Sequence, residues 1–414
     1  MADVRAAAEA VFRQESGRIL AALIRISGSF DLAEEALQEA FASALGNWPD
    51  TGIPQNGAGW IMTTAHRRLI DAVRRNRTWD EKQESLRYAA EMSGAWLGPD
   101  SEEGSMHFPD DRLRLIFTCC HPALNREAQV ALTLRTLGGL STAEIAKAFL
   151  VPEPTLAQRL VRAKHKILEA RIPYEVPPPS RLPERLTSVQ AVIYLIFNEG
   201  YIAASGDQLV RTGLCSEAIR LGRMLCELLP GDAENLALLA LMLLHDSRRE
   251  VRVRHGELVT LEDQDRSLWD RRAIAEGLRL VEKALSFGAA GGYQLQAAIA
   301  ALHAEARTAE ETDWPQIAAL YRRLLQRNPS RVIALNHAVA VAMSDGLEIG
   351  LKRIDDLGAA GELNDYYLFH AARADILRRL DRPGDAADAY RRALALVTNG
   401  VERSFLHKRL QTLA

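Results

Sequence analysis

The sequence has 414 residues, a formal net charge of −3 at pH 7 and 48% hydrophobic residues. This length exceeds the size at which one hydrophobic core keeps growing, so two or three domains are expected. The sequence contains no run of roughly 18 to 20 uncharged apolar residues, and it lacks the apolar core of a secretory signal. These features predict a cytoplasmic protein without a membrane segment.

Apolar residues recur at the i, i+3, i+4 spacing of amphipathic helices along most of the chain, whereas alternating β-branched runs are scarce. The pattern predicts an all-α protein. Clusters of Pro and Gly interrupt it at 47–59, 94–105 and 171–184. The third cluster holds three consecutive prolines (177–179), which cannot continue a helix and favour an extended spacer. It therefore predicts a domain boundary.

The segment 30–45 predicts a helix with one apolar and one acidic side. Its apolar side consists of Leu32, Ala36, Leu37, Ala40 and Phe41. Its exposed side carries Glu34, Glu35, Gln38 and Glu39. Residues 28–59 contain five acidic side chains and no Lys or Arg. An acidic helix suits a basic protein surface, although an ordinary solvated face is the alternative.

The segment 59–78 predicts a second helix whose exposed side is basic. Its apolar side consists of Ile61, Ala65, Leu69 and Ala72. Its exposed side carries Arg67, Arg68, Arg74, Arg75 and Arg77. These five arginines face one acid, Asp71, so the net charge of 60–78 is +4. Clustered arginines suit nucleic-acid phosphates, although this helix too fits an ordinary solvated face.

A helix-turn-helix pattern occupies 140–168 and follows a strongly acidic segment, 80–111, with a net charge of −7. Ser141 or Thr142 can cap its first helix. The short turn "LVPEP" leads into a second helix with Pro154 in its first turn, where the missing N–H costs little. The buried side of the second helix is predicted to be Leu156, Leu160, Ala163 and Ile167.

The opposite side of this second helix is polar and basic. It presents Thr155, Gln158, Arg162 and His165, with Arg159 and Lys166 beside them. Reading a DNA major groove requires forked donors for guanine, amides for adenine and cations for phosphates. This face offers all three, so it predicts DNA binding. The alternative is the solvated face of an ordinary helical hairpin.

The four cysteines are Cys119, Cys120, Cys215 and Cys226, and they form no C-x-x-C pair, so reduced thiols are expected. Cys119, Cys120 and His121 are adjacent, but neighbours on a helix diverge by about 100°. No second ligand pair stands nearby at zinc-like spacing. We therefore expect small buried thiols and no metal site.

Weak internal repeats follow the prolines. Residues 319–330 resemble 388–399, and Tyr321 and Tyr390 lie 69 residues apart, about twice the 34-residue period of tetratricopeptide helix pairs. The clearest unit is 366–396. The repeats predict a solenoid whose groove takes a protein or peptide partner, the alternative being a stabilising scaffold.

Three further stretches of this half, 194–201, 244–249 and 261–272, combine acidic side chains, His245 and aromatic rings. Buried ion pairs and core packing explain such stretches at least as well as a functional site does. Of the three, only "LEDQDRSLW" (261–269) is kept as a candidate interaction surface.

The order of an acidic helix, an arginine-rich helix, an acidic linker and a helix-turn-helix, over about residues 8–172, resembles a bacterial RNA polymerase sigma factor of the extracytoplasmic-function type. The stretch "DLAEEALQEAF" resembles the core-binding helix of region 2, and "WIMTTAHRRLIDAVRRNR" resembles the −10 helix. Residues 112–168 resemble region 4, which reads the −35 element. The stretch "LPERLTSVQAVIYLIFNEGY" and the repeats after it resemble the subgroup with a large C-terminal extension. Arg67 departs from the family, in which Asn is common at this position.

The resemblance implies two partners, core RNA polymerase and promoter DNA. The residues implied to dock the polymerase are Asp31, Glu34, Glu35, Gln38 and Glu39. The residues implied to hold the −10 element and an unstacked base are Arg67, Arg68, Arg74, Arg75 and Arg77. The residues implied to enter the −35 major groove are Thr155, Gln158, Arg159, Arg162 and Lys166. The acidic linker is implied to thread the polymerase cleft.

The predicted organisation has five parts. They are sigma region 2 at 1–79, an acidic linker at 80–111, sigma region 4 at 112–172, a Pro-rich linker at 173–184 and a helical, tetratricopeptide-like extension at 185–414. No phosphate-loop, dinucleotide or nucleophile motif appears, so no enzyme, catalytic residue, cofactor or metal is expected. The alternative function is a helix-turn-helix regulator or helical adaptor that acts without polymerase.

Overall fold

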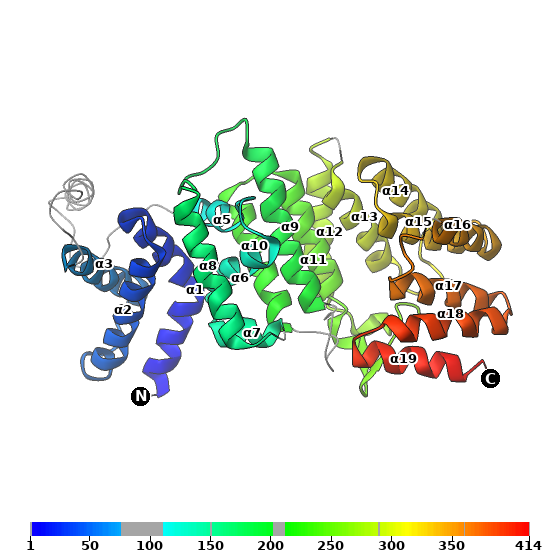
Figure 1. Ribbon diagram of the computed structural model, residues 1–414, viewed down its shortest axis with the longest axis horizontal. Helices are drawn as coiled ribbons and strands as arrows, with labels where there is room; N and C mark the ends of the chain where they lie inside the picture. Colours follow the sequence, from blue (N-terminus) through cyan, green and yellow to red (C-terminus); the bar gives the residue numbers. More distant parts are fainter. Residues whose placement is uncertain are drawn as a thin grey trace. The chain divides into compact units, whose positions relative to one another are not determined.

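A computed structural model of the chain describes residues 2–75, 111–149, 151–201, 212–288, 290–359 and 361–413. Over these residues the fold is helical, with one short two-stranded hairpin (Figure 1). The predicted all-α class is therefore confirmed. The chain divides into two compact units, 1–192 and 193–414. The division falls inside α9 (Leu182–Tyr201), downstream of the predicted Pro-rich linker.

Unit 1 begins with a bundle of three mutually packed helices, α1 (Ala2–Ser27), α2 (Phe30–Thr51) and α3 (Gly57–Arg75) (Figure 1). The largest side chain in its core is Trp48, which is 1% exposed and packs edge-on against Trp60 with ring centroids 5.7 Å apart. An amphipathic helix gains most of its stability from burying its apolar side in this way.

The turn between α2 and α3 starts later than the Pro and Gly cluster at 47–59 predicts. Helix α2 runs through Pro49 and ends at Thr51. Gly52 follows with a φ of 83°, a left-handed conformation that glycine adopts without a steric penalty. Its N–H donates to the carbonyl of Trp48 at 3.0 Å and so closes the helix.

The rest of unit 1 contains α5 (Arg112–Cys119), α6 (Arg126–Thr136), α7 (Thr142–Ala148) and α8 (Glu153–Glu169). Helix α1 packs against α5 and α6, so the two halves of unit 1 are in contact. An almost fully buried ion pair joins Arg25 of α1 to Asp111, with Nε and Oδ2 2.7 Å apart. The hydroxyl of Tyr174 donates to the carbonyl of Ala21 at 2.8 Å.

Unit 2 is built from consecutive helices that pack on their neighbours in chain order (Figure 1). Its elements after α9 are α10 (Thr212–Leu228), α11 (Ala233–Asp246), η1 (Arg249–Val251), β1 (Val253–Arg254), β2 (Glu257–Leu258), η2 (Arg266–Leu268), α12 (Arg271–Leu285), α13 (Gly292–Glu305), α14 (Trp314–Arg327), α15 (Arg331–Ser344), α16 (Leu347–Ala359), α17 (Tyr367–Arg379), α18 (Pro383–Leu396) and α19 (Gly400–Gln411). Strands β1 and β2 pair antiparallel.

Two main hydrophobic clusters stabilise unit 2. One gathers α11, α12 and α13 around Leu241 and Trp269, and the other gathers α15 to α19 around Ile354 and Tyr390. The predicted repeat at 366–396 is the helix pair α17 and α18, with Pro383 in the first turn of α18. Proline is suited to that position because the N–H it lacks has no helical partner there.

Gly350 lets α15 and α16 approach closely, because a Cβ at this position would overlap the backbone and side chain of Ala342. We expect Gly350→Ala to destabilise unit 2 by about 1 to 3 kcal/mol, the usual cost of overpacking. The matched control is Gly384→Ala on α18, where a Cβ meets open space and where reduced unfolded-state entropy stabilises by about 0.4 to 1 kcal/mol. Thermal unfolding of the two variants measures the difference. Equal melting temperatures would contradict this packing.

Candidate functional site

The first candidate surface is the acidic side of α2. Ser29 caps the helix, its Oγ accepting a hydrogen bond from the N–H of Leu32 at 3.4 Å. The opposite side is buried through Ala33, Ala36, Leu37 and Ala40. Of the predicted polymerase-docking residues, Asp31, Glu35 and Gln38 are exposed, and Glu34 and Glu39 are half-buried. Helical periodicity thus places all five on one side of α2.

Lys164 of α8 contacts this acidic side. Its Nζ lies 2.9 Å from Asp31 Oδ1 and 2.9 Å from Glu34 Oε2. The Lys164 side chain is 14% exposed and that of Glu34 is 17% exposed, whereas that of Asp31 is 77% exposed. Burial lowers the pKa of Lys164, but the two carboxylates outweigh burial and raise it overall. The ammonium group therefore stays charged at neutral pH.

The second candidate surface is the basic side of α3. Arg67, Arg68 and Arg74 are exposed on it, and Arg75 is the last residue of α3. The remaining predicted residue, Arg77, and the acidic linker except Asp111 lie outside the described residues. Arg68 Nε stands 3.7 Å from Glu39 Oε2 of α2, so the acidic and basic sides of this bundle adjoin.

The third candidate surface belongs to the helix-turn-helix of α7 and α8. Ser141 and Glu144 form a capping box at the start of α7, with hydrogen bonds of 3.1 and 2.7 Å. In α8 the buried residues are Leu156, Leu160, Ala163 and Ile167, as predicted. The outward side presents Thr155, Gln158, Arg162 and Lys166 as exposed side chains, with Arg159 half-buried.

Sequence reasoning missed Lys164 as a functional candidate. The residue follows Leu160 by four positions and precedes Ile167 by three, so it lies at the edge of the buried side of α8. That position indicated a half-buried lysine in need of a partner. It gave no indication that the partner would be the acidic helix α2, from which Lys164 is separated by 130 residues or more.

The adjacent cysteines are packed in the core. Cys119 Sγ lies 3.3 Å from Thr136 Oγ1, and Cys120 Sγ lies 3.6 Å from Thr133 Oγ1. Burial raises the pKa of Cys120 to about 12 and raises the pKa of Cys119 as well, so both stay protonated thiols. Among the residues that the structure describes, no cluster of three or more His, Cys, Asp or Glu side chains is arranged to hold a metal ion.

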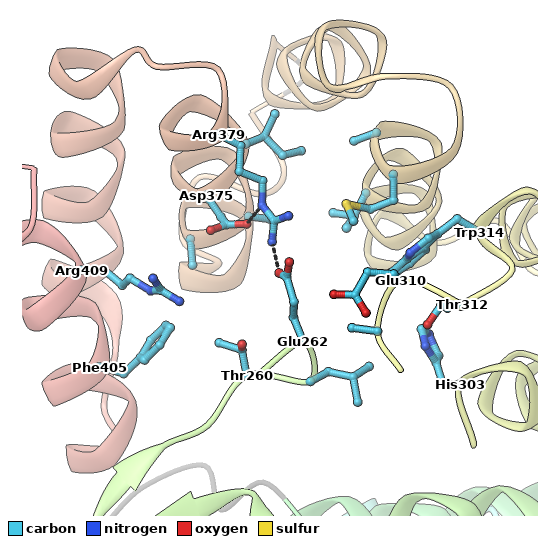
Figure 2. A pocket seen from close by; sticks show the side chains of 18 of the residues that line it. Thr260, Glu262, His303, Glu310, Thr312, Trp314, Asp375, Arg379, Phe405 and Arg409 are labelled. Atoms are coloured by element: carbon cyan, nitrogen blue, oxygen red, sulfur yellow. Dashed lines mark hydrogen bonds and ion pairs between the residues drawn. The ribbon is translucent and has the colours of Figure 1, made fainter. Parts of the chain in front are cut away.

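Unit 2 contains a cavity of about 520 Å³ (Figure 2), a volume within the usual range of ligand pockets. Figure 2 shows Phe405 and Arg409 on one side of it, and His303 and Trp314 on the other. The candidate stretch 261–269 contributes Leu261, Glu262 and Arg266 to its wall. The structure thus places part of that stretch at a cavity.

Charged groups of both signs line this cavity. Arg379 pairs with Glu262 at 2.5 Å and with Asp375 at 2.7 Å (Figure 2). Burial, and to a smaller extent the positive charge of nearby Arg248, lowers the pKa of His303 to about 4. Its imidazole is therefore neutral at pH 7, and Nδ1 has no hydrogen-bond partner in the part of the chain that is described. The cavity thus combines an apolar wall with polar groups able to orient a bound molecule.

Comparisons with known proteins agree with the helix arrangement. Residues 11–78 match Sigma-70 region 2, residues 114–167 match Sigma-70, region 4, and residues 185–285 match a family of unknown function (DUF6596). An uncharacterized protein of Rhizobium meliloti (strain 1021) is 43% identical over 401 residues, covering 95% of this chain and 93% of that protein. No solved structure matches.

A region 2 bundle and a region 4 helix-turn-helix in one unit define a transcription initiation factor that binds RNA polymerase and DNA. The chain belongs to the sigma-70 family, as a sigma factor of the extracytoplasmic-function type with an additional C-terminal domain. The sigma factor families are not enzymes. None of the helices in the described ranges is long and apolar enough to cross a bilayer.

Proposed function

We propose that this sigma factor docks on core RNA polymerase through the acidic side of α2 and recognises two promoter elements through α3 and α8. The proposal rests chiefly on one observation. The segments that match regions 2 and 4 present an acidic, an arginine-rich and a polar-basic helix side, one suited to each of these three tasks. A carboxylate-rich side suits basic polymerase helices, and arginines suit phosphates.

The individual roles follow from the chemistry of each side. Polymerase contacts are assigned to Asp31, Glu34, Glu35, Gln38 and Glu39 of α2. Contacts with the −10 element are assigned to Arg67, Arg68, Arg74, Arg75 and Arg77. Contacts in the −35 major groove are assigned to Thr155, Gln158, Arg159, Arg162 and Lys166. We place the protein in the cytoplasm, where the polymerase acts.

The overall negative charge of the chain is compatible with this role. Polymerase supplies most of the DNA affinity and holds both reading helices near the promoter, which raises their effective concentration. The free chain, with a formal net charge of −3, should then bind promoters poorly. Tight, sequence-specific promoter binding by the protein alone would favour a regulator that acts without polymerase.

The test is multi-round transcription with purified core polymerase and the full chain on a genomic fragment library, with mapping of 5′ ends. We expect discrete start sites only when the protein is added, each preceded by a shared two-part motif. If no start sites appear and the chain does not bind core polymerase, the sigma function is wrong and a helix-turn-helix regulator or helical adaptor takes its place.

We assign a regulatory or protein-interaction role to unit 2, because promoter recognition does not require it. The cavity of about 520 Å³ supports this assignment, since a protein or peptide partner could insert side chains between its aromatic and charged walls. The wall includes Leu261 and Glu262 of the candidate interaction surface 261–269.

Filling this cavity should alter regulation without altering basal transcription. Ala372 lines the cavity from α17 and is half-buried, so Ala372→Phe is expected to change promoter output in cells several-fold. Transcription with purified core polymerase should stay at the wild-type level. Ala395→Phe, on an exposed position of α18 outside the cavity, is the matched control. Wild-type output in cells from both variants would count against a regulatory role for the cavity.

A further inference from the structure

The two DNA-reading modules of unit 1 are held together by polar contacts that bury charge. The Arg25 and Asp111 side chains are 9% and 4% exposed in their ion pair. Lys164 adds a second connection, between α8 and the acidic side of α2, with two oxygen contacts of 2.9 Å. Unit 1 is therefore closed, with region 4 resting on region 2.

This second connection uses carboxylates that we assign to polymerase binding. The Glu34 side chain is 17% exposed, and its Oε2 lies 2.9 Å from the ammonium group of Lys164. A basic polymerase residue cannot pair with Glu34 while the ammonium group of Lys164 occupies the same place, and Asp31 is partly engaged as well. The remaining carboxylates, Glu35 and Glu39, face no lysine of α8 among the ion pairs of the described residues.

The closed arrangement also leaves a buried carboxylate oxygen without a hydrogen bond among the described residues. Glu34 Oε1 is buried and has no hydrogen-bond partner among the described residues. A buried acceptor without a partner destabilises the state that contains it. Exposing Glu34 to water, or to a polymerase residue with several N–H donors, would satisfy this oxygen. The contact is thus suited to being exchanged for a better one.

We infer that Lys164 is an intramolecular competitor of core RNA polymerase for the acidic side of α2, and that polymerase binding displaces it. This inference rests on the proposed function. A basic polymerase residue replaces Lys164 as the cationic partner of Asp31 and Glu34. Helix α8 is thereby released from α2. Four of the five predicted DNA-reading side chains of α8 are exposed in the closed form, and the fifth, Arg159, is half-buried, so the competition acts chiefly on polymerase binding and not on the DNA face.

The thermodynamic consequence is a reduced apparent affinity. When only a fraction of the free protein is open, the apparent dissociation constant equals the intrinsic constant divided by that fraction. Removing the positive charge of Lys164 raises the open fraction and leaves every proposed polymerase contact of α2 in place. Such a variant should bind polymerase more tightly than the wild type, whereas loss of an ordinary structural contact would weaken binding.

The experiment compares the full-length wild type with Lys164→Gln, Lys164→Arg and Lys147→Gln for binding to purified core polymerase without DNA. Lys147 is the matched control because it is exposed on the neighbouring helix α7, has no ion pair among the described residues and is not one of the proposed DNA contacts. We expect several-fold tighter binding for Lys164→Gln and wild-type binding for Lys164→Arg and Lys147→Gln. Equal affinity of Lys164→Gln and the wild type would overturn the competition.

A distance measurement keeps the test decisive if Lys164→Gln folds poorly. Spin labels at Ala42→Cys on α2 and Leu168→Cys on α8 occupy exposed positions, in a Cys226→Ser background because the other three cysteines are buried. Adding core polymerase should lengthen the distance between the labels. An unchanged distance in a protein that binds polymerase refutes the displacement of α8. Failure of the wild type to bind polymerase refutes the proposed function instead.

Discussion

Glu35→Lys should weaken binding to core RNA polymerase by roughly tenfold to a hundredfold, because reversing one member of an interfacial charge pair costs about 2 kcal/mol or more. Glu35 is exposed on α2 and forms no ion pair among the described residues, so its replacement should leave the fold intact. The readout is the dissociation constant for purified core polymerase, together with thermal unfolding of the free protein.

The matched control is Asp50→Lys on the same helix. Asp50 is exposed near the C-terminal end of α2, where a cation interacts favourably with the helix dipole. This control should unfold at or above the wild-type temperature and bind polymerase normally. Equal weakening by both variants would indicate a general charge effect and would contradict a polymerase-binding role for the acidic side of α2.

Arg162→Ala should reduce transcription from a cognate promoter by roughly tenfold to a hundredfold, because a lost base contact costs about 1 to 3 kcal/mol. Arg162 is exposed on α8, on the side away from the buried residues Leu160 and Ala163. The informative measurement is the promoter preference of the variant holoenzyme on a library randomised across the −35 element. Preference should relax at one position if Arg162 reads a base.

Leu168→Ala is the control for Arg162→Ala, since Leu168 is 60% exposed on the same helix and carries no charge. It should preserve both promoter output and sequence preference. Uniform weakening by Arg162→Ala at every promoter would assign Arg162 to a phosphate contact. Unchanged output would remove Arg162 from the DNA interface.

The periodicity of single helices was readable from the sequence because it depends on residues only three or four positions apart. Leu156, Leu160, Ala163 and Ile167 were predicted to be buried, and all four are. The capping of α7 was predicted as Ser141 or Thr142, and the structure selects Ser141, which forms a capping box with Glu144. The same local pattern predicted the acidic side of α2 but did not identify Lys164 of α8 as its partner within the chain.

The cavity in unit 2 could not be predicted from the sequence. Its wall combines Glu262 and Arg379, which are 117 residues apart, with Trp314 and Phe405 from other helices. The composition of 261–269 predicts an interaction surface, but composition alone does not distinguish a cavity wall from core packing. Only the packing of α13, α14, α15, α17 and α19 around the loop before η2 places these side chains together.

The sequence by itself determined the all-α class, the helix sides and the resemblance to a sigma factor, since these follow from short-range spacing and from motifs. The tertiary structure alone decided that region 4 rests on region 2 and that Lys164 pairs with Asp31 and Glu34. The physical reason is that a half-buried charge needs a counter-charge. Which distant carboxylate supplies it depends on how whole helices pack, and no local pattern encodes that choice.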